Sequence, residues 1–332
     1  MEGYTIVICT HNPDQKIIER LFAAIKKFDL SDGINLEVII ADSNSSQQLA
    51  SENYVKKFLA FNSEFKILRV NKSGLTNARI EGIRCARYPW VIFFDDDNEP
   101  DVAYLQILKA LTKRFPDVRV WGPGKIKVEF DGVSVANKFT NSKRELFQER
   151  DLKSTNFDNN SNGSEYFPPG SGMVIHIDVL RDYHLKVSQY IYTMTDRNGK
   201  NLTSGGDVQI ILNAVRMGYY AGSSHLLKLN HIIKKERLKL GKITKLQYWL
   251  SSSYKKAYNE IFPDNAFEIS YISNKQIFSL IYYHIKVVLF KYGYKEAVFR
   301  FYARLGELNS NVIASNQTRR PALLKFFENL IR

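Results

Sequence analysis

The sequence has 332 residues, of which 44% are hydrophobic and 24% charged, so it can bury a large core and is not a disordered chain. Its formal net charge of +13 predicts an anionic partner, such as nucleic acid, a phosphorylated ligand or an acidic membrane surface. Two cysteines exclude a disulfide framework, and the lack of a secretory signal or of a long apolar run predicts a cytoplasmic protein without a spanning helix.

The first hundred residues alternate between apolar strands and amphipathic helices. Strands are predicted over residues 4–10, 36–41, 65–70 and 90–94, with helices between them. This alternation is typical of parallel strands flanked by helices, whose ligands bind beyond the carboxyl ends of the strands. The polar side chains that follow these strands, Thr10, Asp42, Asn71 and Asp95 to Asp97, therefore predict one site at this edge of the sheet.

Three consecutive aspartates, Asp95, Asp96 and Asp97, follow the fourth predicted strand directly. Carboxylates at this spacing repel one another, and their hard oxygen atoms suit Mg²⁺ or Mn²⁺. From these residues alone, two interpretations stay open. The cluster is either a metal site or a solvated acidic turn.

Further along the chain the pattern becomes less regular. A helix is predicted over residues 102–115 and a short strand over 118–121, and the polar segment 131–165 is interpreted as a long loop. That loop could be a lid, an acceptor loop or a disordered insertion. Another strand is predicted over 173–177. Asp207 then lies near the start of a predicted helix, where a carboxylate can simply cap the helix.

From Lys234 onward, lysine and arginine are mixed with aromatic and aliphatic residues, and segment 282–304 is amphipathic and basic. Two interpretations are open here as well. The region could dock on an anionic membrane surface, or it could be a helical subdomain with a solvated basic face.

Seven motifs, in this order and spacing, resemble glycosyltransferase family 2, the inverting nucleotide-sugar enzymes with the GT-A fold. Over residues 4–240 they are VICTHNPD, VIIADSNSS, NKSGLTNARIEGI, FFDDDNEPD, GSGMVIHIDVL, LTSGGDVQIILNAVRMGYYAG and LKLNHIIKKERL. The last three are especially similar to enzymes that build bacterial surface polysaccharides.

The resemblance implies an α/β fold of the Rossmann-like GT-A type, with a mixed, mainly parallel sheet flanked by helices. It places a nucleotide-sugar-binding half in residues 1–125 and an acceptor-binding half in residues 126–240 of one glycosyltransferase domain. Residues 241–332 carry no motif of the family, and we expect a basic, aromatic C-terminal region made of helices.

The resemblance also implies donor-side roles. Thr10 and Asn12 would contact the nucleotide, Asp42 would hydrogen-bond the base, and Arg79 would contact the diphosphate or brace the aspartates. Lys72 is a further basic group that could neutralise phosphate. Asp95 and Asp97 match the Asp-x-Asp element, in which Asp97 would bind Mn²⁺ or Mg²⁺. His231 would complete the metal site. Asp95 or Asp96 would meet the ribose, and either neighbour could share the metal.

On the acceptor side, Asp207 matches the family's catalytic base. Gly206 stands where the family commonly has glutamate, and Gln209 stands where many relatives have glutamate; both are assigned to the acceptor side together with Gly172. The implied reaction is metal-dependent, inverting, hexosyltransferase-type transfer, with a UDP-sugar as the favoured donor. The acceptor would be a hydroxyl of a glycan or lipid-linked glycan in surface polysaccharide synthesis, on the cytoplasmic side or peripheral at the inner face of the cell membrane.

The sequence also leaves three alternative functions to consider. A non-catalytic nucleic-acid- or polyanion-binding protein fits the charge, but no nucleic-acid-binding module is recognisable and nucleic acid is not an expected partner. A nucleotidyltransferase would need a glycine-rich phosphate loop after the first strand, and residues 10–14 contain no glycine. A degenerate transferase that only binds nucleotide-sugar would fit the departures next to Asp207.

Overall fold

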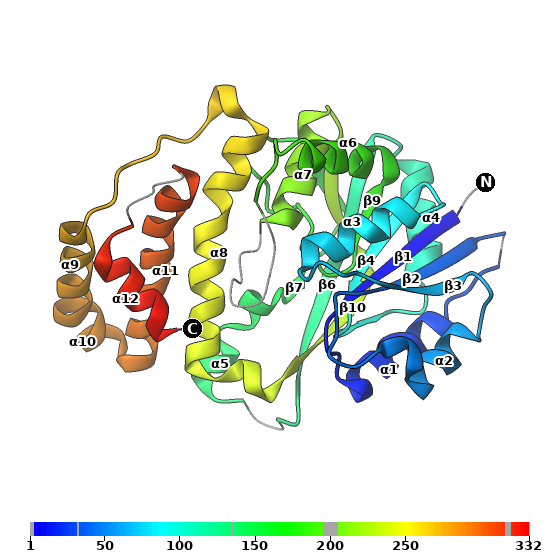
Figure 1. Ribbon diagram of the computed structural model, residues 1–332, viewed down its shortest axis with the longest axis horizontal. Coiled ribbons are helices and arrows are strands. Elements are labelled where there is room, and N and C mark those ends of the chain that lie inside the picture. Colours follow the sequence, from blue (N-terminus) through cyan, green and yellow to red (C-terminus); the bar gives the residue numbers. More distant parts are fainter. Residues whose placement is uncertain (1–2, 32, 134–135, 195–204, 316–319, 332) are drawn as a thin grey trace. The chain divides into compact units, whose positions relative to one another are not determined.

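The computed structural model describes residues 3–31, 33–133, 136–194, 205–315 and 320–331 (Figure 1). The chain forms two compact units, each built from segments that are far apart in sequence. The first unit comprises Met1–Glu129, Phe147–Tyr190 and Ile210–Ile233, and the second comprises Phe130–Leu146, Ile191–Gln209 and Lys234–Arg332. The domain limits expected at residues 125 and 240 stay predictions.

The first unit is organised around a mixed sheet in the strand order β3-β2-β1-β4-β9-β6-β10-β5, with β7 paired to β6 and β8 to β10. Its strands are β1 (Gly3–Thr10), β2 (Asn35–Asp42), β3 (Phe65–Arg69), β4 (Trp90–Asp95), β5 (Asn98–Pro100), β6 (Val118–Asp131), β7 (Arg150–Asp151), β8 (Asn156–Asp158), β9 (Met173–His176) and β10 (Tyr220–Lys234). The first four strands are parallel, whereas β9 runs antiparallel to β4 and β6. The predicted α/β fold with a mixed sheet is confirmed.

Helices cover both faces of the parallel strands. They are α1 (Gln15–Lys26), η1 (Leu49–Ser51), α2 (Asn53–Leu59), α3 (Leu75–Cys85), α4 (Tyr104–Arg114) and α6 (Ile177–Ser188). Alternate residues of β1 point to opposite faces: Ile6 and Ile8 join a core cluster with α1, α2 and α4. Val7 faces α3 so closely that a Cβ atom at Gly82 would lie 2.4 Å from its side chain. Only glycine fits there.

Two long strands were not predicted at their full length. β6 continues ten residues beyond the expected strand 118–121, and β10 was not expected as a strand at all. In the second half of β6, Lys125, Lys127 and Glu129 alternate with buried apolar residues, so its charged face concealed the strand. The prediction of one uninterrupted loop over 131–165 is also wrong, because it contains α5 (Lys138–Asn141), η2 (Arg144–Phe147), β7 and β8.

The second unit is mainly helical, which confirms the expected C-terminal helical extension. Besides α5, its helices are η3 (Lys235–Leu238), α8 (Leu240–Ile261), η4 (Pro263–Asn265), α9 (Asn274–Tyr283), the π-helix η5 (His284–Val288), α10 (Leu289–Tyr292), α11 (Tyr294–Ala314) and α12 (Ala322–Leu330). Helix α7 (Gly206–Arg216) begins in this unit and continues into the first. Its core includes Tyr248, Trp249, Ile277 and Leu305. Within the described ranges, no helix is long and apolar enough to cross a membrane.

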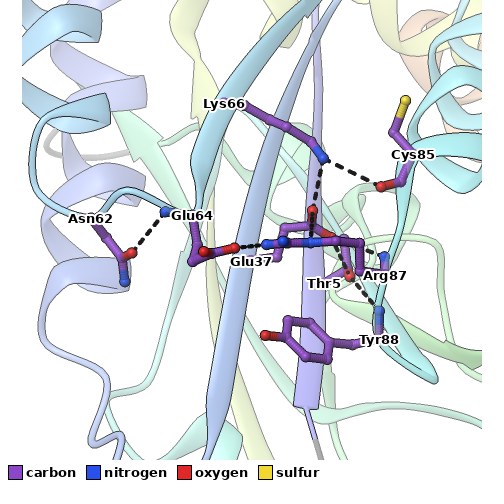
Figure 2. Close-up of polar contacts among 8 residues, drawn as sticks. All are labelled: Thr5, Glu37, Asn62, Glu64, Lys66, Cys85, Arg87 and Tyr88. Atoms are coloured by element: carbon purple, nitrogen blue, oxygen red, sulfur yellow. Dashed lines mark hydrogen bonds and ion pairs between the residues drawn. The ribbon is translucent and has the colours of Figure 1, made fainter.

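A buried carboxylate stabilises the parallel strands near their amino ends. Glu37 of β2 is fully buried and accepts hydrogen bonds from Thr5 of β1 (2.8 Å) and Lys66 of β3 (2.8 Å), and from the backbone N–H and Nε of Arg87 (both 3.0 Å). Figure 2 shows these groups converging on Glu37. Thr5 lies five residues before Thr10 on β1, about 16 Å along the strand, so this cluster is remote from the predicted site.

Candidate active site

The three aspartates lie where the fold predicts a ligand site. β4 ends at Asp95, which lies beside Cys9 in the register with β1, so the aspartates follow the carboxyl ends of both central strands. A tight turn then leads into β5, and the backbone N–H of Asp95 donates to the Asn98 side chain at 3.1 Å. All three aspartates are half-buried, so their charges are only partly hydrated.

Two of the carboxylates are held by hydroxyl groups from other segments. The Thr10 hydroxyl at the end of β1 donates to Asp96 Oδ2. The Ser171 hydroxyl, which precedes β9, donates to Asp95 Oδ2 at 3.2 Å. Each hydroxyl donates to a carboxylate oxygen, which offsets part of the repulsion between neighbouring carboxylates.

Asp97 pairs with His231, although the two residues are 134 positions apart in the chain. β10 runs antiparallel to β5 with His231 opposite Asn98, which brings His231 Nε2 to 3.3 Å from Asp97 Oδ1. The other ring nitrogen, Nδ1, lies 2.8 Å from the carbonyl oxygen of Phe147. Because a carbonyl can only accept, Nδ1 carries a proton and donates.

This arrangement fits a metal ligand. With the proton on Nδ1, a neutral imidazole presents the lone pair of Nε2 to the Asp97 carboxylate, so a proton or a cation between them is needed for a favourable contact. A backbone carbonyl on the far ring nitrogen is the usual partner of a metal-binding histidine. Among the described residues, no group of three or more histidine, cysteine, aspartate or glutamate side chains is arranged around a common metal position. The pair would therefore be two protein ligands, and a bound ligand or water would supply the others.

An ionic cluster secures β5 beside this pair. Arg20 of α1 contacts Glu99 of β5 at 2.6 Å and Glu129 of β6 at 2.7 Å, and the Asn230 side chain of β10 donates to Glu99 at 3.1 Å. The hydrogen bonds from Arg20 hold the pKa of Glu129 below its usual range although burial opposes the shift. Four elements are thus joined immediately next to Asp97 and His231.

The loops after β1 and β2 are bound to each other. The Asn12 side-chain oxygen accepts hydrogen bonds from the backbone N–H and the hydroxyl of Ser46, both at 2.8 Å. The backbone of Asn12, which has a positive φ of 50°, donates to the Ser45 hydroxyl at 2.8 Å. Asp42 is only 2% exposed and accepts from the Ser45 backbone at 2.9 Å. These two strand ends therefore form one ordered edge.

The two predicted phosphate-binding cations lie in different surroundings. Arg79 of α3 is buried, with its guanidinium carbon 5.5 Å from the centre of the Phe93 ring in β4. Lys72 is exposed in the loop before α3. Arg79 is thus fixed against the strand that carries the aspartates, while Lys72 is accessible to solvent.

Gly172 connects β9 to the same edge. Its φ is +72°, a conformation that glycine adopts without strain, and its N–H donates to the Phe93 carbonyl at 3.0 Å. Its carbonyl accepts from the hydroxyl of Tyr104. Burial raises the pKa of Tyr104, so the phenol stays a neutral donor. Gly172 fixes the backbone next to Ser171, whose hydroxyl reaches Asp95.

Of the residues expected on the acceptor side, Gly172 belongs to the first unit, whereas Gly206, Asp207 and Gln209 belong to the second. Asp207 is in the first turn of α7, directly after Gly206. Gln209 is fully buried, and its amide donates to Glu260 Oε2 of α8 at 2.6 Å. Residues 202–204 of the LTSGGD motif lie outside the described residues.

Glu260 is a residue that the sequence analysis missed. Its carboxylate also accepts from the backbone N–H groups of Thr193 (3.0 Å) and Met194 (3.2 Å) and from the Thr193 hydroxyl (2.6 Å). Glu260 therefore joins the segment before residue 195 to the start of α7. A single glutamate within a helical pattern gave no signal of this role.

The structure brings Thr10, the three aspartates, Gly172 and His231 together in the first unit through the contacts above, with Asn12 and Asp42 at the neighbouring strand ends. Ser171, Asn98 and the Phe147 carbonyl were not predicted there. Ser171 and Asn98 directly adjoin predicted residues, Gly172 and Asp97, which is a signal that could have found them. The Phe147 carbonyl is a backbone group, so no side-chain pattern in the sequence could have indicated its contact with His231.

Comparisons with known proteins give one family. The model described as Glycosyl transferase family 2 matches residues 5–183, and no curated protein matches the chain. Solved structures that resemble it include S. aureus TarS residues 1–349, at 14% identity and a TM-score of 0.48 over 96% of this chain and 92% of that one. GalNAc-T7 with UDP, GalNAc and Mn²⁺ resembles it at 15% identity and a TM-score of 0.51, over 96% of this chain and 56% of that one. The second likeness supports the shared fold.

Proposed function

Because the chain belongs to glycosyl transferase family 2, whose model matches residues 5–183, we propose that it transfers a sugar from a nucleoside-diphosphate sugar, with UDP favoured, to a hydroxyl of a glycan or lipid-linked glycan. The membership confirms the resemblance found in the sequence, and the chain is a glycosyltransferase. Metal dependence, inversion of configuration, the donor and the acceptor are the proposed parts.

The observation that carries the proposal is the pair formed by Asp97 and His231. A carboxylate oxygen and an imidazole nitrogen 3.3 Å apart, with the far nitrogen held by the Phe147 carbonyl, suit a divalent cation such as Mn²⁺ or Mg²⁺. Such a cation, when bound, would neutralise the diphosphate of the donor as a Lewis acid. Whether Asp95 is a third ligand is part of this proposal.

The other donor-side residues would bind and orient the nucleotide. Thr10 and Asn12 lie at the end of β1, and Asp42 at the end of β2 would meet the base. Asp96 or Asp95 would accept a hydrogen bond from the ribose. Arg79 would brace the aspartates or contact the diphosphate, and exposed Lys72 would add positive charge near the phosphates.

In the proposed mechanism Asp207 accepts the proton of the acceptor hydroxyl. The hydroxyl oxygen attacks the anomeric carbon from the face opposite the nucleotide, so the configuration inverts as the bond to the diphosphate breaks. Where many members of the family carry glutamates, this chain has Gly206, which places no side chain next to the Asp207 carboxylate, and Gln209, which carries a neutral amide instead of a charge. Together with Gly172 they would shape the acceptor side.

We place this reaction in surface polysaccharide synthesis, on the cytoplasmic side of the cell membrane and peripheral to it. The basic, aromatic region 241–332 supports this location, because a lipid-linked acceptor is reached at the membrane surface. The compact glycosyltransferase domain would then be residues 1–240.

The proposal is tested by nucleotide binding with and without Mn²⁺. GalNAc-T7 was solved with UDP and Mn²⁺, so UDP and UDP-sugars are the first probes. We expect UDP with Mn²⁺ to stabilise the wild-type protein, by about 2.7 kcal/mol at a concentration 100 times Kd, and Asp97→Ala to lose the Mn²⁺-dependent part. Differential scanning fluorimetry measures both.

The matched control is Asp131→Ala, which removes an exposed aspartate from the end of another strand, β6. It should bind like the wild type. Equal stabilisation of Asp97→Ala with and without Mn²⁺, at the wild-type level, would show that Asp97 is not a metal ligand. No stabilisation by any nucleotide-sugar would contradict the proposed reaction.

A further inference from the structure

One surface helix of the second unit exposes apolar side chains around much of its circumference. The helix consists of α9, the π-helix η5 and α10, which follow one another without a break from Asn274 to Tyr292. Ile277, His284 and Val288 are buried and recur seven and four residues apart, so they form one stripe toward the core of the unit. The rest of the helix faces outward.

The outward residues are unusually apolar for a protein surface. We call Phe278, Tyr282, Tyr283, Ile285, Val287 and Phe290 the outer face. Phe278 is 65% exposed and Phe290 85% exposed. A single exposed apolar side chain is ordinary, but six within thirteen residues of one helix mark an interaction surface.

The charged side chains of the helix and of the sequence directly beside it all have one sign. Lys275, Lys286, Lys291 and Lys295 lie on or next to the helix, and the sequence contains no aspartate or glutamate from residue 269 to residue 295. The Lys286 ammonium lies 4.7 Å from the centre of the Tyr282 ring. Lysines among exposed aromatic rings are suited to an interface where apolar side chains enter and ammonium groups stay in a polar, anionic layer.

We propose that the outer face docks on an anionic lipid membrane surface. This inference deepens the proposed membrane location and rests on it, by naming the helix that makes the contact. A lipid surface accepts the apolar side chains between its headgroups and the four lysines at its phosphates. A second copy of this helix fits less well, because its lysines would meet lysines without any acidic partner on the helix.

The test measures binding of the full chain to vesicles of phosphatidylglycerol mixed with phosphatidylcholine, and to vesicles of phosphatidylcholine alone. We expect flotation with the anionic vesicles only, weakened by added salt. Each lysine near such a surface contributes about five-fold to binding, so Lys286→Glu with Lys291→Glu should lower it by at least about 25-fold. Phe290→Ser should also weaken it, since an exposed side chain is removed without disturbing the core.

Two control variants distinguish binding through the outer face from an effect of net charge or of any exposed aromatic side chain. Lys57→Glu with Lys113→Glu changes the net charge equally, at exposed positions of the first unit, and should bind nearly as the wild type does. Tyr190→Ser removes another side chain that is 85% exposed and should have no effect. Equal loss in both charge variants would overturn the proposal, because net charge alone would then explain the binding.

Two further outcomes are decisive. Absence of vesicle binding, or Phe290-dependent dimers by light scattering without vesicle binding, would also overturn the proposal. UDP binding is measured on the same samples by scanning fluorimetry. A variant of the outer face that loses vesicle binding and keeps nucleotide binding supports the proposed docking. If nucleotide binding is absent from every sample, this result counts against the proposed function only.

Discussion

Asp207 is the second residue of α7, so its carboxylate lies in the first turn of the helix. If this carboxylate is the base, Asp207→Asn should leave UDP binding unchanged and lower turnover by about 10²–10⁴-fold, the usual contribution of a general base. Turnover is measured as the release of UDP. The donor in this assay is the UDP-sugar that stabilises the protein most.

Asp178→Asn is the matched control, because Asp178 lies in the first turn of another helix, α6. It should keep full activity. Turnover at the wild-type rate in Asp207→Asn would remove Asp207 from the mechanism, and lost UDP binding would assign it to the donor side instead.

Glu37 predicts a pH dependence of stability. Burial raises the pKa of this carboxyl group, but the hydrogen bonds from Lys66, Arg87 and Thr5 outweigh burial and hold the pKa below its usual range. Its stabilisation is therefore present above the ordinary glutamate pKa of about 4.3 and is lost as the pH falls through the lower folded-state pKa. Glu37→Gln should destabilise by about 1–3 kcal/mol at neutral pH.

Urea unfolding at a series of pH values measures the difference in the free energy of unfolding between the wild type and Glu37→Gln. This difference should shrink as the buffer becomes more acidic than the folded-state pKa of Glu37. Glu81→Gln is the control, since Glu81 forms an exposed pair with Arg84 on α3 and such pairs contribute little. A difference between wild type and Glu37→Gln that stays constant with pH would contradict the assigned cause.

At the scale of elements, Glu260 explains why an amide is suitable at position 209. Gln209→Glu would place two carboxylates within hydrogen-bonding distance, because Gln209 Nε2 and Glu260 Oε2 are 2.6 Å apart. We expect a loss of about 1–3 kcal/mol and a displaced start of α7. The exchange Gln209→Glu with Glu260→Gln restores one donor and one acceptor and should recover most of the stability.

Urea unfolding of the two single variants and the exchange variant forms a double-mutant cycle. Glu268→Ala, at an exposed glutamate in the same unit, is the control and should be neutral. If the exchange variant is as unstable as Gln209→Glu alone, the contact between the two side chains does not determine the stability of this region.

Elements with a clear apolar pattern were predictable from the sequence. The expected strand 90–94 matches β4 to within one residue, and the helix expected between the third and fourth strands is α3, because burial on both faces or at helical spacing leaves a clear apolar pattern. β10 was missed, since His225, Lys228 and Asn230 interrupt its apolar residues. Its pairing with β5 depends on contacts between residues 129 to 133 positions apart in the chain, which no local pattern encodes.

The site was predictable to a similar extent. Strand ends and the resemblance indicated the aspartates and His231, and the structure brings Asp97 and His231 into contact. Ser171 could have been suspected only as the neighbour of Gly172, and the carbonyl of Phe147 could not be assigned, because its role follows from the backbone path at the end of η2.

At the scale of the whole molecule, the proposed donor residues belong to the first unit and the outer face belongs to the second. Hydrogen exchange should therefore separate the two proposed ligands. UDP with Mn²⁺ should slow exchange at the ends of β1, β2 and β4 and in β5 and β10, by up to about 100-fold at a concentration 100 times Kd.

The segment 274–292 should be unaffected by UDP, and anionic vesicles should protect it instead. Mass spectrometry of peptides from both units, with Asp97→Ala as the reference that lacks Mn²⁺-dependent protection, makes the comparison. Protection by UDP confined to 274–292 would contradict the placement of the donor site in the first unit.

The position of β10 between β6 and β5 also determines where the chain can be shortened. The family model ends at residue 183, yet a fragment of that length would lack both His231 and the strand that joins β6 to β5. It would leave two unpaired strand edges, which promote aggregation. The smallest piece that could fold with the Asp97–His231 contact intact therefore extends through Lys234, about fifty residues beyond the part of the chain that the family pattern recognises.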